Sequence, residues 1–203
     1  MTTADRIAAA LRPLAPEGKL KPNEVPFIDK LAALWDARLM PLRDDPAWVT
    51  AARSMLGQKE VPGPSHNSWI ARGWAKLGAS WYNNDETPWC GLFVAWCLNE
   101  AGLPYPKNFP AAKSFATYGE ECTPRLGALA VKGRKGGNHV FFIVGETADK
   151  RFYKALGGNQ RNMVSIVDIA KSEVDAVRWP SGVPQPPKYL PTLPAGTIGA
   201  SEA

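Results

Sequence analysis

Apolar residues recur at helical spacing through the first half of the chain. This period predicts helices from Asp5 to about Leu14 and from Asn23 to Leu39, separated by prolines and a glycine. A further start signal at Asp44-Asp45-Pro46-Ala47 begins a helix that Gly57 ends. Later, Ser65 is expected to cap a helix that carries Trp69 and Trp74. The first hundred residues are therefore predicted to be mainly helical.

A strongly apolar helix is predicted next, from about residue 88 to Gly102. Thr87 is the expected cap, Pro88 suits the first helical position, and Cys90 follows in the first turn. From Gly127 onward the period becomes strand-like, and the turns contain glycine and aspartate. The predicted strands cover residues 128–131, 139–144, 152–156, 163–167 and 174–179. Helices followed by successive short strands indicate an α+β domain with an antiparallel sheet, one edge of which meets the Cys90 helix.

The chain is predicted to have three parts. Residues 1–40 form an N-terminal helical segment, which either packs on the main domain or acts as a separate wall-binding or oligomerisation module. Residues 44–180 form the main domain. Residues 181–203 are rich in proline and small residues, which is typical of a flexible tail.

Composition narrows the function classes. The 203 residues carry a formal charge of +5, which favours anionic partners such as acidic cell-wall polymers. The densest basic cluster, Lys132, Arg134 and Lys135, lacks the flanking aromatic residues of single-stranded nucleic-acid binders, so no nucleic-acid partner is expected. No segment approaches the roughly 20 apolar residues that span a bilayer, and the start of the chain does not resemble an export signal. Neither stable membrane insertion nor a signal peptide is expected.

The three cysteines are expected to be free thiols, and only one of them lies where a thiol is activated. Cys90 and Cys97 would be about 10 Å apart along one helix, too far for a disulfide. Cys90 lies near the N-terminal N–H groups and the positive end of the helix dipole, which stabilise a thiolate. Cys90 is thus the candidate nucleophile, whereas Cys97 and Cys122 are expected to be structural. With two histidines and no C-x-x-C pair, neither a metal nor a cofactor is expected.

A thiol nucleophile needs a base and a group that orients that base. His139 follows a glycine-containing loop and opens an apolar strand, so it is the first candidate for the base, with His66 as a competitor. Gly157-Gly158-Asn159-Gln160 follows the next strand and supplies two amides that could accept the imidazole N–H. Asn159 is the first choice and Gln160 the second.

Other residues near the nucleophile are candidates for substrate or oxyanion contacts. The backbone N–H of Cys90 would supply one oxyanion donor, and Tyr82 of the upstream loop could supply a second. Asp85 could orient the substrate or the loop, and Trp89 is the best candidate for an aromatic substrate contact. Glu60 is expected to be a solvated or helix-capping acid.

These motifs resemble the CHAP and NlpC-type cysteine hydrolases of peptidoglycan, particularly phage-associated members. The likeness rests on the tract from Thr87 to Cys97, on Asn138-His139-Val140, and on Leu156-Gly157-Gly158-Asn159-Gln160, and it spans about Trp48 to Pro180. The chain departs from the family pattern at Gly127-Ala128, where Gly-Asp is common, and at Asn138-His139, where Gly-His is common.

The resemblance implies a papain-like α+β fold and a catalytic domain at 44–180 that cleaves an amide bond of cell-wall peptides through a thioester. Cys90 would be the nucleophile, His139 the base and Asn159 the third member. The implied protein is an endolysin, acting as an endopeptidase or N-acetylmuramoyl-L-alanine amidase, held in the host cytoplasm until a holin-type pore releases it. The alternatives are an antibacterial effector, a virion-associated hydrolase, and a wall-binding module of the same fold without turnover.

Overall fold

A computed structural model describes residues 45–134 and 136–194, together with residues 5, 8, 25, 26, 28 and 29. The chain divides into two compact units, Met1–Asp44 and Asp45–Ala203. The described positions of the first unit are helical. Most residues of the two helices expected at 5–14 and 23–39 lie outside the described residues. In the described part of the chain, no helix combines the length and apolar composition needed to span a bilayer.

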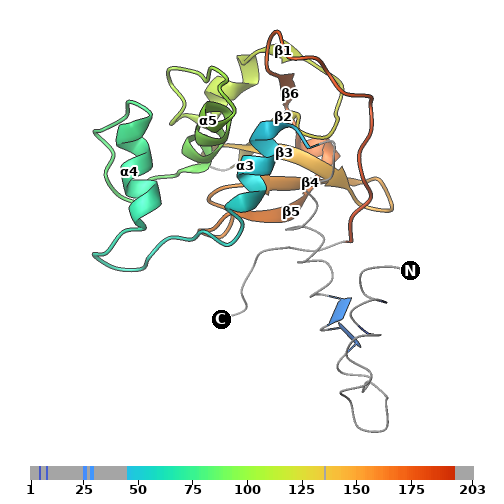
Figure 1. Cartoon of the computed structure of the whole chain (residues 1–203), viewed down its shortest axis with the longest axis horizontal. Coiled ribbons are helices and arrows are strands. Elements are labelled where there is room, and N and C mark those ends of the chain that lie inside the picture. The colour runs from blue at the N-terminus through green and yellow to red at the C-terminus, as the bar shows by residue number, and fades with distance from the viewer. Residues whose placement is uncertain are drawn as a thin grey trace, which may run out of the picture. The chain divides into compact units, whose positions relative to one another are not determined.

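The second unit is built on a six-stranded sheet with the order β1-β6-β2-β3-β4-β5 (Figure 1). All of its strand pairs are antiparallel. The strands are β1 (Glu120–Glu121), β2 (Leu129–Arg134), β3 (Gly137–Glu146), β4 (Phe152–Gly157), β5 (Ser165–Ala170) and β6 (Ala176–Trp179). The predicted α+β class with an antiparallel sheet is therefore confirmed. The two-residue strand β1 was not predicted, because so short a segment has no readable period.

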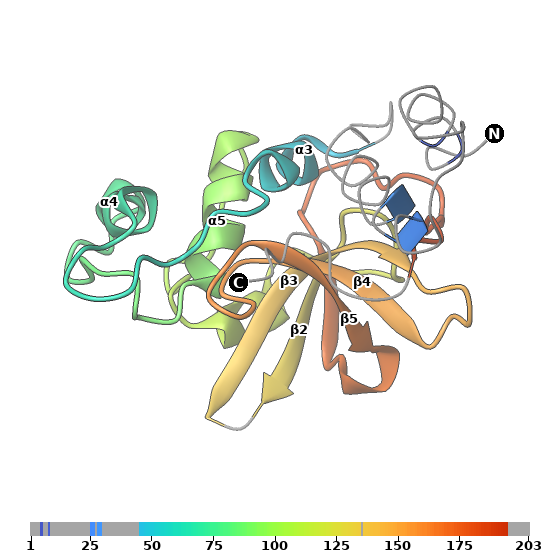
Figure 2. The ribbon, with the colours of Figure 1, turned by 90° about the horizontal axis from the view of Figure 1, so that it is seen from below.

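The helices gather beside the sheet. They are α3 (Ala47–Ser54), α4 (Ser68–Lys76) and α5 (Cys90–Glu100), with short 3₁₀ helices η3 (Ala112–Thr117) and η4 (Lys171–Glu173). Helix α5 contacts β3, β4, α3 and α4, whereas η3 contacts β2, β3 and β6. Figure 2 shows α3 and α5 beside the sheet, with α4 beyond α5. Asn67, and not Ser65, caps α4, since its side chain accepts from the N–H groups of Trp69 and Ile70.

The core lies around α5 and β3. Helix α5 carries apolar residues on all of its sides, which is typical of a buried helix, and its residues from Cys90 to Ala95 are buried. The segment Val140–Val144 of β3 is also completely buried, as expected for a central strand covered on both faces. Gly91 is required here, because a Cβ at this position would lie 2.0 Å from the carbonyl oxygen of Phe109. The first turn of α5 is thereby held tightly against the loop that precedes η3.

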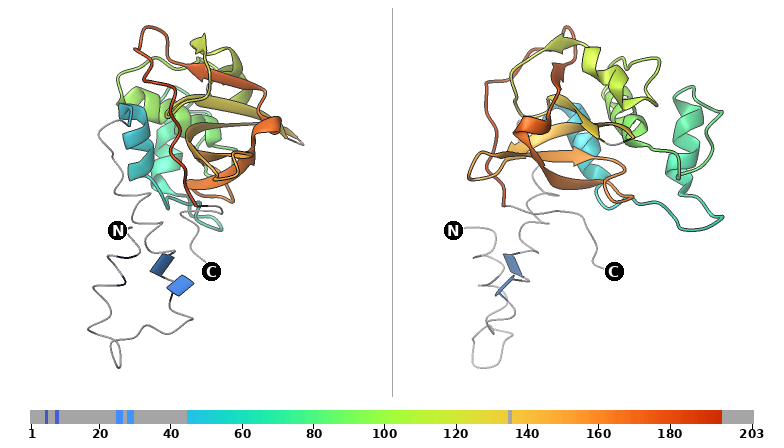
Figure 3. Two further views of the ribbon diagram at one scale, coloured as in Figure 1. Left: turned by 90° about the vertical axis from the view of Figure 1, so that its right-hand side faces the viewer. Right: turned by 180° about the vertical axis from the view of Figure 1, so that it is seen from behind.

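The proline-rich segment at 181–194 packs on the domain, so the prediction of a flexible tail is wrong for these residues. Prolines lack an N–H but their carbonyls still accept hydrogen bonds, and Pro191 accepts from the N–H of Glu146 at 2.9 Å. Leu193 donates to the carbonyl of Glu146 at 3.0 Å, and the carbonyl of Pro194 accepts from the buried ammonium of Lys154. Figure 3 shows this segment running along the domain from the end of β6. Residues 195–203 lie outside the described residues.

Candidate active site

The predicted nucleophile and base meet at one end of the sheet. Because β3 and β4 are antiparallel, the start of β3, which carries His139, lies beside the end of β4 at Gly157. Helix α5 packs on both strands, and Phe93 of its first turn contacts the ring of Phe142. The turn after β4 therefore lies beside both the first turn of α5 and the beginning of β3.

Cys90 is the first residue of α5, and Trp89 is its N-cap. The expected cap at Thr87 and the expected first helical position at Pro88 are therefore wrong. Thr87 instead donates through its N–H and its hydroxyl to Oδ1 of Asn84, at 2.8 and 3.0 Å. These two bonds order the loop that leads to the start of the helix. The prediction that Cys90 lies in the first turn is confirmed.

The surroundings of the Cys90 thiol act on its pKa in opposite directions. Burial raises its pKa, whereas the backbone N–H groups of Val140, Gly91 and Cys90 itself and the charge of Arg134 lower it. Burial dominates, so the thiol has a pKa above its ordinary value. The expectation of a thiolate activated by the helix terminus is wrong for this state, because desolvation outweighs the N–H groups. The contact with Val140 places the sulfur beside the residue that follows His139.

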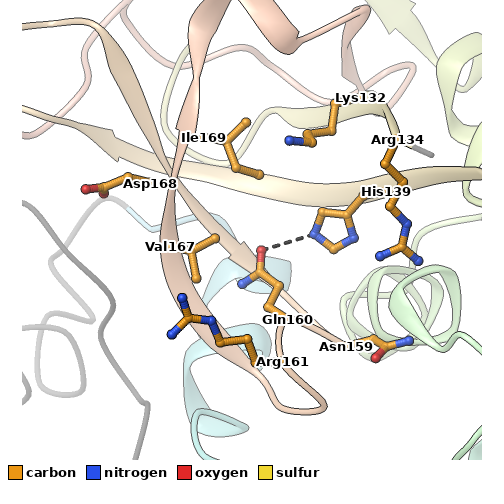
Figure 4. Close-up of a pocket in the computed structure, with 9 residues that line it drawn as sticks. All are labelled: Lys132, Arg134, His139, Asn159, Gln160, Arg161, Val167, Asp168 and Ile169. Carbon is orange, nitrogen blue, oxygen red and sulfur yellow. Dashed lines mark hydrogen bonds between the residues drawn. The ribbon is translucent and has the colours of Figure 1, made fainter.

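The imidazole of His139 is held by Gln160. Its Nε2 lies 3.1 Å from Oε1 of Gln160 (Figure 4). The imidazole ring also stacks on Phe141. The amide nitrogen of Gln160 donates to the carbonyl oxygens of Ser165 and Ala155, at 2.6 and 3.3 Å. Since those carbonyls can only accept, the amide oxygen must face the imidazole. The neutral ring therefore carries its proton on Nε2 and leaves Nδ1 as the acceptor.

Nδ1 of His139 is buried and has no hydrogen-bond partner among the described residues. It makes no hydrogen bond with the Cys90 thiol in this state; catalytic contacts often tighten only when substrate binds. Burial lowers the pKa of His139 to about 4, with a further decrease from the charges of Arg134 and Lys132, although the Gln160 hydrogen bond raises it. The pair is therefore a neutral thiol beside a neutral imidazole.

Stability should depend on the protonation of His139. The pKa is about 4 in the folded chain and 6.5 for the ordinary imidazole, so between these values the unfolded chain binds more protons. The contribution is complete above about pH 6.5 and is lost as the pH falls toward 4, for a total of roughly 3 kcal/mol. Between pH 7 and pH 5, the free energy of unfolding measured with urea should fall by about 2 kcal/mol more in the wild type than in His139→Gln.

The other histidine provides the control for this measurement. His66→Gln removes the other, exposed imidazole and leaves His139 in place, so the loss of stability that His139 causes in acid should persist in this variant. Equal losses of stability in the wild type and His139→Gln would show that the folded imidazole is not kept neutral.

Asn159 does not orient the histidine, so the first choice for the third member is wrong and the second, Gln160, is the partner. With its amide correctly oriented, Asn159 donates to Oε1 of Glu60 at 3.3 Å and accepts from the N–H of Trp89 at 3.2 Å. It thus connects the turn after β4 to the start of α5. The two glycines before it allow this approach. A Cβ on Gly157 would lie 3.2 Å from Nε2 of His139, and one on Gly158 would lie 2.6 Å from Trp89.

Trp89 and Asp85 were expected to contact substrate. Both are buried and bonded to other parts of the protein, so neither is available for that contact in this state. Trp89 is 0% exposed and donates through Nε1 to Glu60 at 2.9 Å. Asp85 is 1% exposed and accepts from the N–H groups of Val61 and Asn67, both at 2.8 Å. Burial opposes its charge, but these bonds and that from His66 together hold the pKa of Asp85 below its ordinary value. Asp85 organises the loop, which was the alternative role considered for it.

None of the described contacts of the remaining candidates involves Cys90 or His139. Tyr82 packs on Trp74 and Trp81, and none of its described contacts involves Cys90. Nδ1 of His66, the competing base, lies 2.9 Å from Oδ1 of Asp85. Cys97 is completely buried, and Cys90, Cys97 and Cys122 are all free, as predicted. Burial raises the pKa of Glu60. The hydrogen bond from Trp89 lowers it, and the charges of Asp85 and Glu86 raise it further, so that the net shift is upward.

An open pocket of about 440 Å³ lies next to His139 and Gln160 (Figure 4). Lys132, Arg134 and Arg161 line it, together with Asp168. The basic cluster before His139 gave a sequence signal for Lys132 and Arg134, but it was considered only as a nucleic-acid signal. Arg161 follows Gln160 directly and was not singled out, because a lone arginine in a turn resembles any solvated charge.

The arrangement contains the groups that nucleophilic chemistry at a carbonyl requires. It offers a thiol at a helix start, an oriented imidazole with a free acceptor nitrogen, and backbone N–H groups beside the sulfur. Comparison of the chain with protein-family models, with curated proteins and with solved structures found no match.

Proposed function

We propose that this protein is a cysteine hydrolase that cleaves an amide bond in the peptides of bacterial peptidoglycan. The observation that carries the proposal is the His139 site. Gln160 fixes the proton on Nε2, and the buried Nδ1 is left free next to the strand residue whose N–H contacts the Cys90 sulfur. A buried acceptor nitrogen without a partner is costly unless it serves chemistry.

The reaction begins from the neutral pair. Nδ1 of His139 takes the thiol proton of Cys90 as the sulfur attacks the amide carbonyl, so charge separates only as the bond forms. The developing oxyanion is stabilised by backbone N–H groups at the start of α5. The imidazolium then protonates the leaving amine, which departs and leaves a thioester on Cys90. Water, deprotonated by His139, hydrolyses the thioester and releases the acid and the thiol.

The substrate class rests on the resemblance of the three motifs to CHAP and NlpC-type enzymes. A papain-like fold belongs to the same proposal and is supported by the order of elements: a nucleophile at the start of a buried helix, then an antiparallel sheet whose third strand, β3, carries the base. The formal charge of +5 supports association with an acidic envelope. An endolysin that clears the wall at lysis is the biological role we propose.

Digestion of purified peptidoglycan tests the function. The full chain should release soluble muropeptides, and mass spectrometry should find new pairs of amino and carboxyl ends at one bond. A new N-terminal alanine would identify an N-acetylmuramoyl-L-alanine amidase, and any other new amine an endopeptidase. Binding to the wall without new amino groups would instead establish a wall-binding module.

A further inference from the structure

The pocket next to His139 and Gln160 has an excess of positive charge. Of its two ion-paired members, Lys132 donates to Glu173, and Asp168 accepts from Lys154. The exposed residues Arg134 and Arg161 have no ion pair or hydrogen bond through their guanidinium groups within 45–134 and 136–194. Both residues line the pocket, and Figure 4 draws them on opposite sides of His139 and Gln160, with the guanidinium of Arg134 beside the imidazole and that of Arg161 pointing away from it.

The pocket borders the proposed base, since His139 is one of the residues that line it. Arg134 is the last residue of β2, and its positive charge lowers the pKa of both Cys90 and His139. Figure 4 draws its guanidinium on the same side of the sheet end as the imidazole. A group bound by Arg134 would thus belong to the residue beside the scissile amide, not to a distant part of the substrate.

The local backbone holds Arg161 in an unusual conformation. Asn159, Arg161 and Asn162 have φ values of 54°, 53° and 62°, in the left-handed region that side chains rarely adopt. Two backbone bonds hold the turn, from the N–H of Gln160 to Met163 and from the N–H of Glu60 to Asn162. Strain of this kind persists where the surroundings impose it, and it clusters at binding and catalytic sites. The same turn fixes both Gln160 and Arg161.

We propose that this pocket binds a carboxylate of the substrate peptide, next to the amide bond that Cys90 attacks, through Arg134, with Arg161 adding positive charge from the other side of the pocket. The proposal rests on the proposed function and specifies its substrate. Guanidinium groups pair with carboxylates by two parallel charge-assisted hydrogen bonds, which fix orientation as well as add affinity. Stem peptides of peptidoglycan carry such carboxylates, on glutamate and at the peptide ends. The pocket selects the acid over its amidated form.

A matched pair of peptides tests this selection. The probe is alanyl-γ-glutamyl-lysine with the glutamate α-carboxyl either free or amidated, so that the two forms differ in charge and hardly in shape. Calorimetric titration of the Cys90→Ala chain should give a dissociation constant for the acid peptide that is lower than that of the amidated peptide by roughly 10-fold or more. The double variant Arg134→Gln and Arg161→Gln, in the same background, should bind the two peptides within about 2-fold of each other.

Arg151→Gln is the control, since it removes the same charge at the other end of β4, where Arg151 pairs with Asp149. It should retain the preference for the acid. Equal affinity for the two peptides, or no binding of the acid at millimolar concentration, would overturn the proposal. If the wild type cleaves peptidoglycan but the two peptides bind equally well, the carboxylate-binding proposal is refuted and the proposed hydrolase function stands. Selective binding without any cleavage would refute the proposed hydrolase and leave the carboxylate pocket standing.

Discussion

Replacing Cys90 with alanine should lower peptidoglycan hydrolysis by roughly three orders of magnitude or more, because no other thiol can take its place. Cys97 is completely buried within α5, and Cys122 lies on another segment of the chain. Cys90→Ser should be nearly as inactive, since a hydroxyl is a much weaker acid than a thiol and His139 is a weak base. Release of amino groups from purified peptidoglycan measures the loss, and circular dichroism confirms that both variants remain folded.

Cys122→Ala is the matched control, because it removes a thiol that is half-buried and outside the site. It should keep activity within about 2-fold of the wild type. Full activity in Cys90→Ala would eliminate the thiol mechanism, and equal losses in both cysteine variants would point to a loss of folding instead.

Replacing Gln160 with leucine should lower kcat/KM by roughly 100-fold, less than the loss of Cys90, since the amide positions the base and does not react. Leucine cannot accept the proton of Nε2, so the tautomer and the ring orientation of His139 are no longer fixed. Asn159→Leu provides the comparison within the same turn. It breaks the contacts with Glu60 and Trp89 but leaves the imidazole held, so its activity should fall by about 10-fold at most.

The pH profile separates positioning from a merely structural effect. Wild-type kcat/KM should fall in acid as His139 becomes protonated, with a midpoint at about 4. In Gln160→Glu the carboxylate stabilises the imidazolium, which moves this midpoint to higher pH. Gln160→Leu and Gln160→Glu both lose the amide N–H that binds Ser165, so they form a pair that differs in charge. Identical acid midpoints in the wild type and Gln160→Glu would show that residue 160 does not act on the base.

The sequence predicted the elements of the domain better than the contacts between them. Periodicity identified five of the strands, and it put Cys90 near the start of a helix and His139 near the start of a strand. It could not decide between Asn159 and Gln160, because they are neighbours in a turn where the alternation of a strand no longer applies. The left-handed backbone at Asn159 and the carbonyls of Ala155 and Ser165 decide that question, and both depend on the folded turn.

Burial explains the other failures of prediction. The position of Cys90 at a helix start was correct, but the direction of its pKa depends on how much water the fold removes from the sulfur. Trp89 looked like an aromatic contact for substrate because its neighbour is Cys90, yet it is enclosed by Gly158, Trp69 and Glu60. The prolines of residues 181–194 suggested a tail, because sequence does not reveal that their carbonyls find partners on Glu146 and Lys154.

The buried, protonated thiol of Cys90 has a consequence for survival outside a reducing compartment. Oxidants and alkylating reagents attack the thiolate, and attack is fastest at exposed sulfur. Cys90 is 2% exposed and its thiol is kept neutral by burial, so both routes are disfavoured; in the proposed reaction the thiol becomes reactive only when substrate allows its proton to pass to His139. The thiol should therefore resist oxidation and alkylation in the absence of substrate. A covalent inhibitor would have to imitate the substrate closely enough to trigger that proton transfer.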